Sequence, residues 1–349
     1  VFDLNQLQGV LMAISHLTKF VLRRPSMFFC SIRLTSLCSQ NCMQCGIPSQ
    51  SDGSFIATRD FAIIAGKLKK YGTRVFNLTG GEPALHPELE EIFRIASDLD
   101  FMGVNLLTNL YYPEARQEKV IELAVRYGIG IHTSYDGIGK TADTLRGAKD
   151  VQKTVERGMK MINALRSRGD YKHKPTATVV LSALNINQLS GIIQNLEELD
   201  WNMNIDLYRW GSSNHRETDL LKIKDPQQIA GAIQQIRKVK NLKTPLWYYD
   251  GILKHQAGEQ AKQCPYLISP TFGSKFFVHE NGDIHTCMSQ ALGNLLQDEI
   301  GELFQSNDWQ AMLRQFENCQ GCWNNCFTPS SRAMSYLHLP TLKQYVFKR

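Results

Sequence analysis

Three cysteines lie within eight residues of one another, and this cluster constrains the fold more than any other feature of the chain. Cys38, Cys42 and Cys45 are separated by three and then two residues, directly after the β-like run 27–34. A four-iron cubane needs a ligand on each of its irons. Three thiolates at this spacing therefore predict a four-iron cluster whose fourth iron stays open to bind another molecule.

Zinc and disulfide bonding are the alternatives for this triplet. A closed structural zinc site needs four ligands in paired, short-spaced knuckles, and no fourth Cys or His lies nearby in the sequence. A disulfide would leave one of the three thiols unpaired. The spacing favours an iron–sulfur cluster, with zinc or buried free thiols as the other interpretations.

A second motif extends this interpretation. Residues 79–83, Thr-Gly-Gly-Glu-Pro, follow the triplet by about 35 residues, at the end of a second predicted strand. Alone, this motif would be a plain turn. Triplet and motif in this order resemble the radical SAM superfamily, in which S-adenosylmethionine (SAM) chelates the fourth iron through its amino and carboxylate groups. The resemblance implies that Gly80, Gly81 and Glu82 bind SAM and that Met43 occupies the bulky position beside the middle cluster ligand.

The resemblance also implies a reaction. In that family the reduced cluster gives one electron to the SAM sulfonium, the C–S bond breaks, and a 5′-deoxyadenosyl radical removes hydrogen from an unactivated carbon. Cys38, Cys42 and Cys45 are then the catalytic cluster ligands. A flavodoxin or ferredoxin is the implied electron donor.

Strand-like and helix-like runs alternate from residue 27 to about 240. The predicted strands are 27–34, 74–78, 103–107, 130–135, 176–181 and 204–208, and the predicted helices are 58–71, 87–99, 113–127, 151–166, 188–198 and 226–239. Six such repeats predict an α/β fold with a parallel sheet and helices outside. The resemblance implies an open partial (β/α)6 TIM barrel over residues 26–240, with its chemistry on the loops after the strands.

Polar residues follow the later strands, where members of the family contact SAM. The resemblance implies this role for Asn109 after the third strand, and for Ser134 and Arg146 after the fourth. Arginine suits the SAM carboxylate because its planar fork donates twice. Asp136 lies in residues 134–137, Ser-Tyr-Asp-Gly, which resemble the Ser-x-Asp-Gly motif of one branch of the family, and it would equally cap a turn. Asn185, after the fifth strand, has an implied cofactor role, with a helix N-cap as the alternative.

The βα rhythm stops beyond about residue 240. An Asn-Gly turn between 276–280 and 283–287 predicts a β-hairpin, and a helix is predicted near 298–316. Together with the cysteine pattern, this makes residues 241–349 similar to the SPASM or shorter twitch extension, a small α+β unit that binds an auxiliary [4Fe-4S] cluster.

Five cysteines compete for the four positions of that auxiliary cluster. They are Cys264, Cys287, Cys319, Cys322 and Cys326. The resemblance implies Cys264 and Cys287 as ligands, with two of the other three completing the set. A four-thiolate zinc site is the alternative. Cys30, within the first strand, is expected to be a packed core thiol.

Residues 1–25 contain a predicted amphipathic helix. Its apolar positions recur at three- and four-residue spacing and are Leu4, Leu7, Leu11, Ile14, Leu17 and Val21. The segment is too polar to span a bilayer. It is expected to cover the bottom of the barrel, with peripheral contact at a membrane surface as the alternative.

Composition narrows the class of protein. Nine cysteines, eight of them in two clusters, favour metal binding and a reducing, cytoplasmic compartment over a disulfide framework. The net charge of +6 is mild and the basic residues are dispersed, so no nucleic-acid partner is expected.

The substrate is less constrained. Peptide maturases of this branch often carry an N-terminal leader-binding domain, and about 30 residues precede the first strand. We therefore expect oxidation or rearrangement of a small-molecule natural product, lipid or cofactor precursor, with modification of a ribosomal peptide second. A non-catalytic iron–sulfur electron carrier and a zinc-dependent nucleic-acid-binding protein are the alternatives from other classes.

Overall fold

The computed structural model describes residues 27, 29–208, 216, 218–256, 275–287 and 290–318. The predicted N-terminal helix and Cys264, Cys319, Cys322 and Cys326 lie outside these residues. No described helix combines the length and the apolar character that a membrane span requires.

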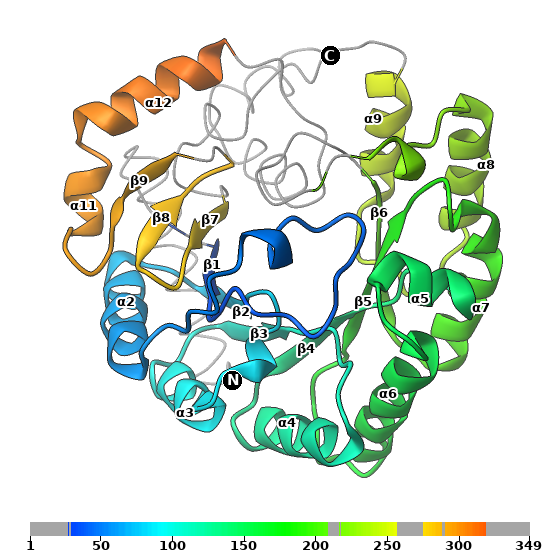
Figure 1. Ribbon diagram of the computed structural model, residues 1–349, viewed down its shortest axis with the longest axis horizontal. Coiled ribbons are helices and arrows are strands. Elements are labelled where there is room, and N and C mark those ends of the chain that lie inside the picture. Colours follow the sequence, from blue (N-terminus) through cyan, green and yellow to red (C-terminus); the bar gives the residue numbers. More distant parts are fainter. Residues whose placement is uncertain are drawn as a thin grey trace, which may run out of the picture.

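One curved sheet organises the described chain (Figure 1). Its nine strands have the order β6-β5-β4-β3-β2-β1-β7-β8-β9. The strands are β1 (Phe29–Arg33), β2 (Val75–Thr79), β3 (Gly103–Leu107), β4 (Gly130–Ser134), β5 (Thr176–Leu181), β6 (Asn202–Leu207), β7 (Lys275–Val278), β8 (Asp283–His285) and β9 (Ala291–Asn294). Strands β1 to β6 pair in parallel in chain order, which confirms the predicted open six-stranded series.

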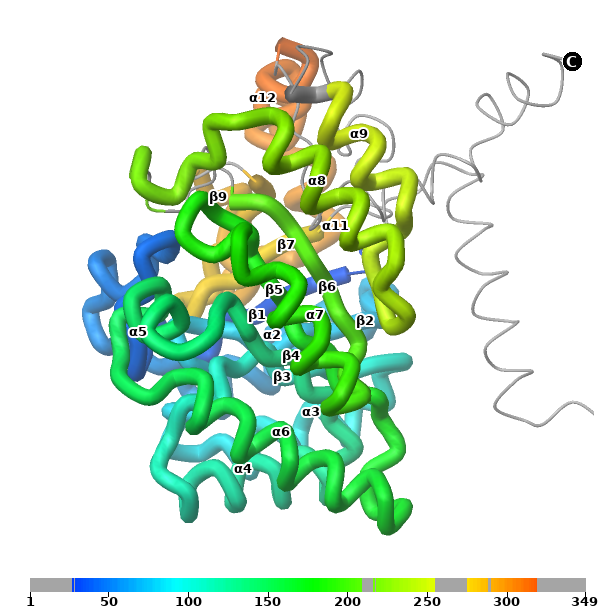
Figure 2. Tube along the Cα trace, turned by 90° about the vertical axis from the view of Figure 1, so that its right-hand side faces the viewer, coloured from blue at the N-terminus to red at the C-terminus, as the bar shows by residue number. Residues whose placement is uncertain are grey.

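Helices surround the outside of this sheet (Figure 1), and the view turned by 90° shows α4 beside α6 and α8 beside α9 (Figure 2). They are α2 (Thr58–Tyr71), α3 (Leu89–Asp98), α4 (Glu114–Arg126), α5 (Lys140–Arg146), α6 (Val151–Ser167), α7 (Leu189–Glu198), α8 (Pro226–Ile236), α9 (Leu246–Gln256), α11 (Ile300–Leu303) and α12 (Asn307–Glu317). Short 3-10 turns are η1 (Pro48–Gln50), η2 (Pro83–Leu85), η3 (Ile186–Gln188) and η4 (Asp219–Leu221).

The two faces of the strands differ in burial, and this places the core. In β2, Phe76 and Leu78 are fully buried, whereas Asn77 between them is half-buried. Helix α3 covers the outer face with residues at helical spacing, among them Ile92 and Phe93. The apolar core therefore lies between the sheet and the helices, while the inner face of the sheet keeps access to solvent.

Residues at the helix ends account for where α2 ends and where α8 begins. Helix α2 ends at Gly72, which adopts the left-handed conformation (φ 109°) that few side chains tolerate. Helix α8 begins with Pro226, and the side chain of Asp225 accepts from the Gln227 N–H.

The predicted helix 298–316 is two helices, α11 and α12. The Ser306 hydroxyl donates to Leu303 O and accepts from the Trp309 N–H, so it ends one helix and caps the next. Helices α5 and α9 and strand β9 were not among the predicted elements. Helix α5 packs on α6, α9 packs on α8, and β9 pairs in antiparallel with β8, so each of them extends a neighbouring element of the chain.

The predicted hairpin forms and joins the barrel sheet. Strand β7 pairs in parallel with β1 and in antiparallel with β8. At the carboxyl ends of these two parallel strands, Arg33, which ends β1, forms an ion pair with Glu280, whose side chain is about 6% exposed. The proposed division at residues 240 and 241 stays a prediction, but these hairpin strands share one sheet with the barrel.

Candidate functional site

The loop that carries the three cysteines is closed at its base by backbone hydrogen bonds. The Leu34 N–H donates to Thr79 O at 2.7 Å, and the Ile56 N–H donates to Leu34 O at 2.9 Å. The first bond ties the start of the loop to β2, and the second joins its two ends. We call residues 35–55 the cluster loop.

The Gly-Gly-Glu turn after β2 packs directly on the cluster loop. Gly81 N–H donates to Thr35 O at 2.8 Å, and Glu82 N–H donates to Leu37 O at 2.6 Å. A Cβ atom on Gly81 would lie 2.2 Å from Leu37 O, and one on Gly80 would lie 2.7 Å from Thr35 O. The close approach that requires glycine is therefore made to the cluster loop; the expected contact of these glycines with SAM stays a prediction.

The Glu82 carboxylate is fully buried beneath this turn. It accepts from the Ala84 N–H at 3.0 Å and from the Asn109 N–H at 2.7 Å. Burial raises the pKa of Glu82 despite these hydrogen bonds. The carboxylate thus joins the loops after β2 and β3, and its expected contact with the SAM ammonium stays a prediction.

Replacing Glu82 by alanine is expected to lower the free energy of unfolding by about 3 kcal/mol, because two backbone N–H groups lose their acceptor. Denaturant unfolding measures this. Glu88→Ala is the control, since Glu88 is exposed and contacts Thr58, and its change should stay within about 0.5 kcal/mol. SAM affinity should fall more than iron content, and equal losses of both would make Glu82 purely structural.

The three thiols lie in a setting that suits a cluster. Cys42 is buried, and Cys38 and Cys45 are half-buried. Burial raises the pKa of Cys38 to about 12, and the thiols of Cys42 and Cys45 contribute to this shift. Burial likewise raises the pKa of Cys45. Because burial, together with repulsion from the neighbouring thiolates, disfavours the charged forms of Cys38 and Cys45, a bound cation or cluster would stabilise them.

Hydrogen-bond donors point at these sulfurs. Asn109 Nδ2 lies 3.8 Å from Cys38 Sγ, and Arg146 Nη1 lies 3.6 Å from Cys42 Sγ. Gln40 is buried in the same loop, and its Nε2 has no hydrogen-bond partner among the described residues. Donors around ligand sulfurs are a property of iron–sulfur sites, so the residues present fit such a cluster.

Among the described residues, no three Cys, His, Asp or Glu side chains converge closely enough to hold one metal ion. A polynuclear cluster spans its ligands more widely than a single ion does. The finding therefore concerns a single ion, and the predicted four-iron cluster stays a prediction. Cys30, by contrast, is fully buried in the core, where burial raises the pKa of its thiol; this confirms its expected packing role.

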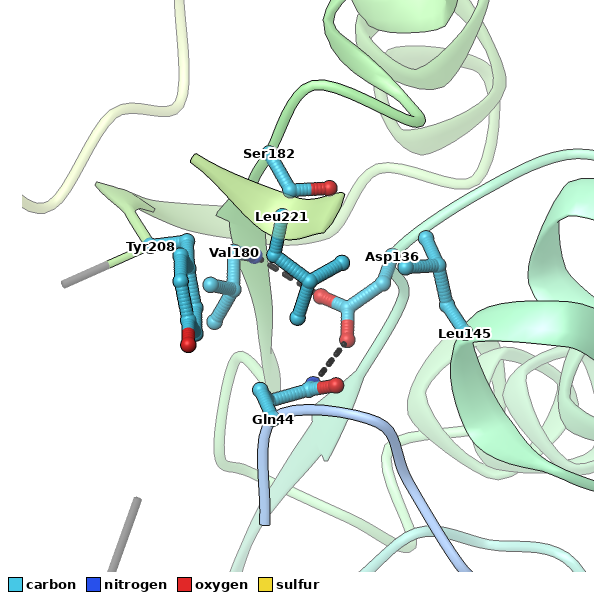
Figure 3. Close-up of a pocket in the computed structure, with 7 residues that line it drawn as sticks. All are labelled: Gln44, Asp136, Leu145, Val180, Ser182, Tyr208 and Leu221. Atoms are coloured by element: carbon cyan, nitrogen blue, oxygen red, sulfur yellow. Dashed lines mark hydrogen bonds between the residues drawn. The ribbon is translucent and has the colours of Figure 1, made fainter. Parts of the chain in front are cut away.

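A small pocket lies beside the cluster loop at the ends of β4, β5 and β6 (Figure 3). Its lining residues are Gln44, Asp136, Leu145, Val180, Ser182, Tyr208 and Leu221. Met43 packs against Leu145, Tyr208 and Leu221 at this place. The pocket therefore adjoins the segment that carries the cluster ligands.

Asp136 is the centre of the polar contacts in this pocket. Figure 3 shows its carboxylate between Gln44 and Val180: Gln44 Nε2 donates to Oδ2 at 3.1 Å, and the Val180 N–H donates to Oδ1 at 2.7 Å. Oδ2 also pairs with Arg146. Although burial alone would lower it, the pKa of Arg146 is raised by Asp136 and by the Cys42 thiol, so the guanidinium stays charged.

Three further residues with predicted roles in binding SAM or the auxiliary cluster lie in different surroundings. Asn185 is buried, and its amide donates to Asp136 O at 2.5 Å and to Val180 O at 2.9 Å, so it links the loops after β4 and β5. Ser134 ends β4 and is half-buried. Cys287 follows β8 and is half-buried. The cofactor roles of Ser134 and Asn185 and the auxiliary role of Cys287 stay predictions.

Gln44 is a functional candidate that sequence reasoning missed, because it sits between two cluster ligands without a motif of its own. The resemblance includes Asp136 in a Ser-x-Asp-Gly motif, but it does not indicate that the Asp136 carboxylate contacts Gln44. Their proximity depends on contact between segments about 90 residues apart, for which local sequence carries no signal.

A polar row crosses the inner face of the sheet. Ser31, Asn77, Asn105 and Gly130 are register partners on β1 to β4. Asn105 Nδ2 donates to Asn77 Oδ1 at 3.0 Å, and Asn77 Nδ2 donates to Ser31 Oγ at 3.3 Å. Since barrel interiors are usually filled with branched apolar residues, this row gives the inner face unusual hydrogen-bonding capacity.

Comparison with known proteins agrees with this geometry. The family model described as "Radical SAM superfamily" matches residues 32–193. The maturation protein SkfB of Bacillus subtilis is 25% identical over 169 residues, which cover 47% of this chain and 38% of that protein. The GTP 3′,8-cyclase of Synechocystis is 24% identical over 223 residues, which cover 62% of this chain and 64% of that protein.

PqqA peptide cyclase of Bradyrhizobium diazoefficiens is 25% identical over 190 residues, covering 52% of this chain and 48% of that protein. The chain thus spans less than half the length of SkfB and of this cyclase. Streptococcus suis SuiB bound to S-adenosylmethionine has a similar fold, with a TM-score of 0.67, 16% identity and coverage of 90% and 75%. The structure of anSMEcpe with bound AdoMet and a peptide has a TM-score of 0.62 and 15% identity, and the match covers 93% of this chain and 97% of that one.

The family match covers the cluster loop, the Gly-Gly-Glu turn and the loops after β3 and β4. The two solved structures are similar to this chain in fold alone. The part of the chain that carries the three thiols lies within the family match. Residues 32–193 therefore match the radical SAM superfamily model, and the described chain has the fold of the solved structures named above.

Proposed function

We propose that the chain is a radical SAM enzyme that binds a [4Fe-4S] cluster through Cys38, Cys42 and Cys45 and cleaves SAM reductively. The observation that supports this most directly is the position of the three thiols, with N–H donors from Asn109 and Arg146 directed at two of them. When bound, cluster and SAM would supply an electron and a 5′-deoxyadenosyl radical that abstracts hydrogen from an unactivated C–H bond.

The chain's own residues hold and shield that site. The Gly81 and Glu82 N–H groups fix the start of the cluster loop, and the Met43 N–H donates to Leu145 O at 2.9 Å, which fixes its centre. Met43 and Leu145 place apolar groups beside the ligands, so they limit water there. Met43, Asn109, Ser134, Arg146 and Asn185 are the further proposed cofactor contacts.

For the substrate we propose a small molecule with several hydrogen-bonding groups, oxidised or rearranged after hydrogen abstraction. The polar row of Ser31, Asn77 and Asn105 supports this, because half-buried amides discriminate strongly in favour of ligands that pair with them. We further propose an auxiliary [4Fe-4S] cluster held by Cys264 and Cys287 with two of Cys319, Cys322 and Cys326.

Peptide modification is the second candidate, and one observation favours it. PqqA peptide cyclase is named for a peptide substrate, and structures of both SuiB and anSMEcpe contain a bound peptide. An amide row would also pair with peptide groups. The two candidates share the same first half-reaction and differ in what occupies the inner face of the sheet.

The test is anaerobic reconstitution with iron and sulfide, followed by dithionite and SAM. We expect 5′-deoxyadenosine to form and about eight irons to bind per chain, four for each proposed cubane. Zinc in place of iron would overturn the proposal. Bound iron with no 5′-deoxyadenosine, alone or with candidate small molecules and peptides added, would favour an electron carrier instead.

A further inference from the structure

Arg146 is a buried cation between a proposed cluster ligand and a carboxylate. Its side chain is about 10% exposed. One terminal nitrogen, Nη1, lies 3.6 Å from Cys42 Sγ, and the other, Nη2, pairs with Asp136 Oδ2. The two ends of the guanidinium fork are therefore occupied by different acceptors, and one acceptor is a proposed ligand sulfur.

Asp136 has little freedom to move away from this pair. Its side chain is about 1% exposed, and it accepts from the Val180 N–H and from Gln44 Nε2. Its backbone carbonyl accepts from Asn185 Nδ2. Figure 3 shows the carboxylate between Gln44 and Val180, so it offers Arg146 a fixed point of attachment.

The backbone on both sides of the Arg146–Cys42 contact is also fixed. The end of α5 packs on the cluster loop, where the Met43 N–H donates to Leu145 O. Gly147 adopts a positive φ of 58°, and a Cβ atom there would lie 2.4 Å from Asn41 O. The distance from guanidinium to sulfur is thus set by the packing of two loops.

We propose that Arg146 acts on the Cys42 thiolate and so on the reduction potential of the cluster, and that Asp136 is the positioning residue that keeps it there. This inference rests on the proposed function, because it requires the cluster. A hydrogen bond and a positive charge at a ligand sulfur stabilise the reduced cluster, which carries more negative charge, and so raise its potential. The family resemblance implied a different role for Arg146, contact with the SAM carboxylate.

The test measures the midpoint potential of the cluster without SAM, by redox titration followed by electron paramagnetic resonance. The proteins are the wild type, Arg146→Gln, Asp136→Asn and the double variant. Arg146→Gln should lower the potential in the wild-type background. In the Asp136→Asn background the same change should have less than half that effect, because the guanidinium is no longer held at the sulfur.

Three controls make the result specific. The signal lost in Cys42→Ala identifies the cluster of interest and separates it from an auxiliary cluster. Asp143→Asn changes a carboxylate in the same helix that instead caps α6 through the Val151 N–H, and it should leave the full Arg146 effect. Arg146→Lys keeps the positive charge but loses the planar guanidinium, and its midpoint potential should lie between those of the wild type and Arg146→Gln. If the Arg146→Gln protein does not hold iron, the Lys variant replaces it in the comparison.

A midpoint potential does not depend on how much protein holds the cluster, so a purely structural role would leave it unchanged. An equal effect of Arg146→Gln in both backgrounds would overturn the positioning role of Asp136. An unchanged potential with SAM affinity weakened tenfold or more would assign Arg146 to SAM instead. A wild-type protein without a reducible cluster would overturn the proposed function itself.

Discussion

Replacing Cys42 by alanine is expected to reduce 5′-deoxyadenosine formation to background. Cys42 is the middle thiol of the triplet, it is buried, and the Arg146 guanidinium is directed at its sulfur. Without it two thiolates remain, and a cubane that has lost a protein ligand is neither retained nor held in register with SAM. The measurement is 5′-deoxyadenosine and iron per chain after anaerobic reconstitution and reduction.

Cys30→Ala is the matched control for this variant. Cys30 lies on β1, only a few residues before the cluster loop, and is fully buried against the core. Its removal should cost about 1 kcal/mol of stability and leave cleavage intact. Undiminished cleavage by the Cys42 variant would remove the central assignment, since no other described cysteine could replace that ligand without moving the loop.

Replacing Gly81 by alanine is expected to lower the free energy of unfolding by about 3 kcal/mol and to reduce iron loading. The added Cβ atom would lie 2.2 Å from Leu37 O and 2.6 Å from Ser36 O. Both are backbone atoms, so no side-chain rotation relieves the overlap. The start of the cluster loop must shift, and Cys38 is the next residue.

Denaturant unfolding and iron analysis of reconstituted protein measure this effect. Gly66→Ala is the control, because nothing lies within 4 Å of its added Cβ atom, and Gly66 sits inside α2. Alanine there should raise the free energy of unfolding by about 1 kcal/mol. If the Gly81 variant matched wild type in both stability and iron, the contact between the turn and the cluster loop would be wrong.

Several features could be predicted because the signal for each is local. The spacing of Cys38, Cys42 and Cys45 is contained in eight residues, and it favours a four-iron cluster with an open position over the other interpretations. Strands such as β2 and helices such as α3 follow from the periodicity of apolar residues, because one face of each element must be buried. The parallel order of β1 to β6 then follows from the regular alternation of these elements.

The surroundings of the thiols were decided by tertiary structure alone. Arg146 and Asp136 come from the segment after β4, about 100 residues beyond Cys42, and Gln44 completes their contacts from the cluster loop. Likewise, β7 pairs with β1 across some 245 residues of chain. Such contacts depend on which loops meet at one end of the sheet and on the shape left between them. Residue spacing indicates which chemical groups are present. Which buried charge faces which sulfur is determined only in the folded chain, because distant segments share one space there and every buried polar group in it must find a hydrogen-bond partner.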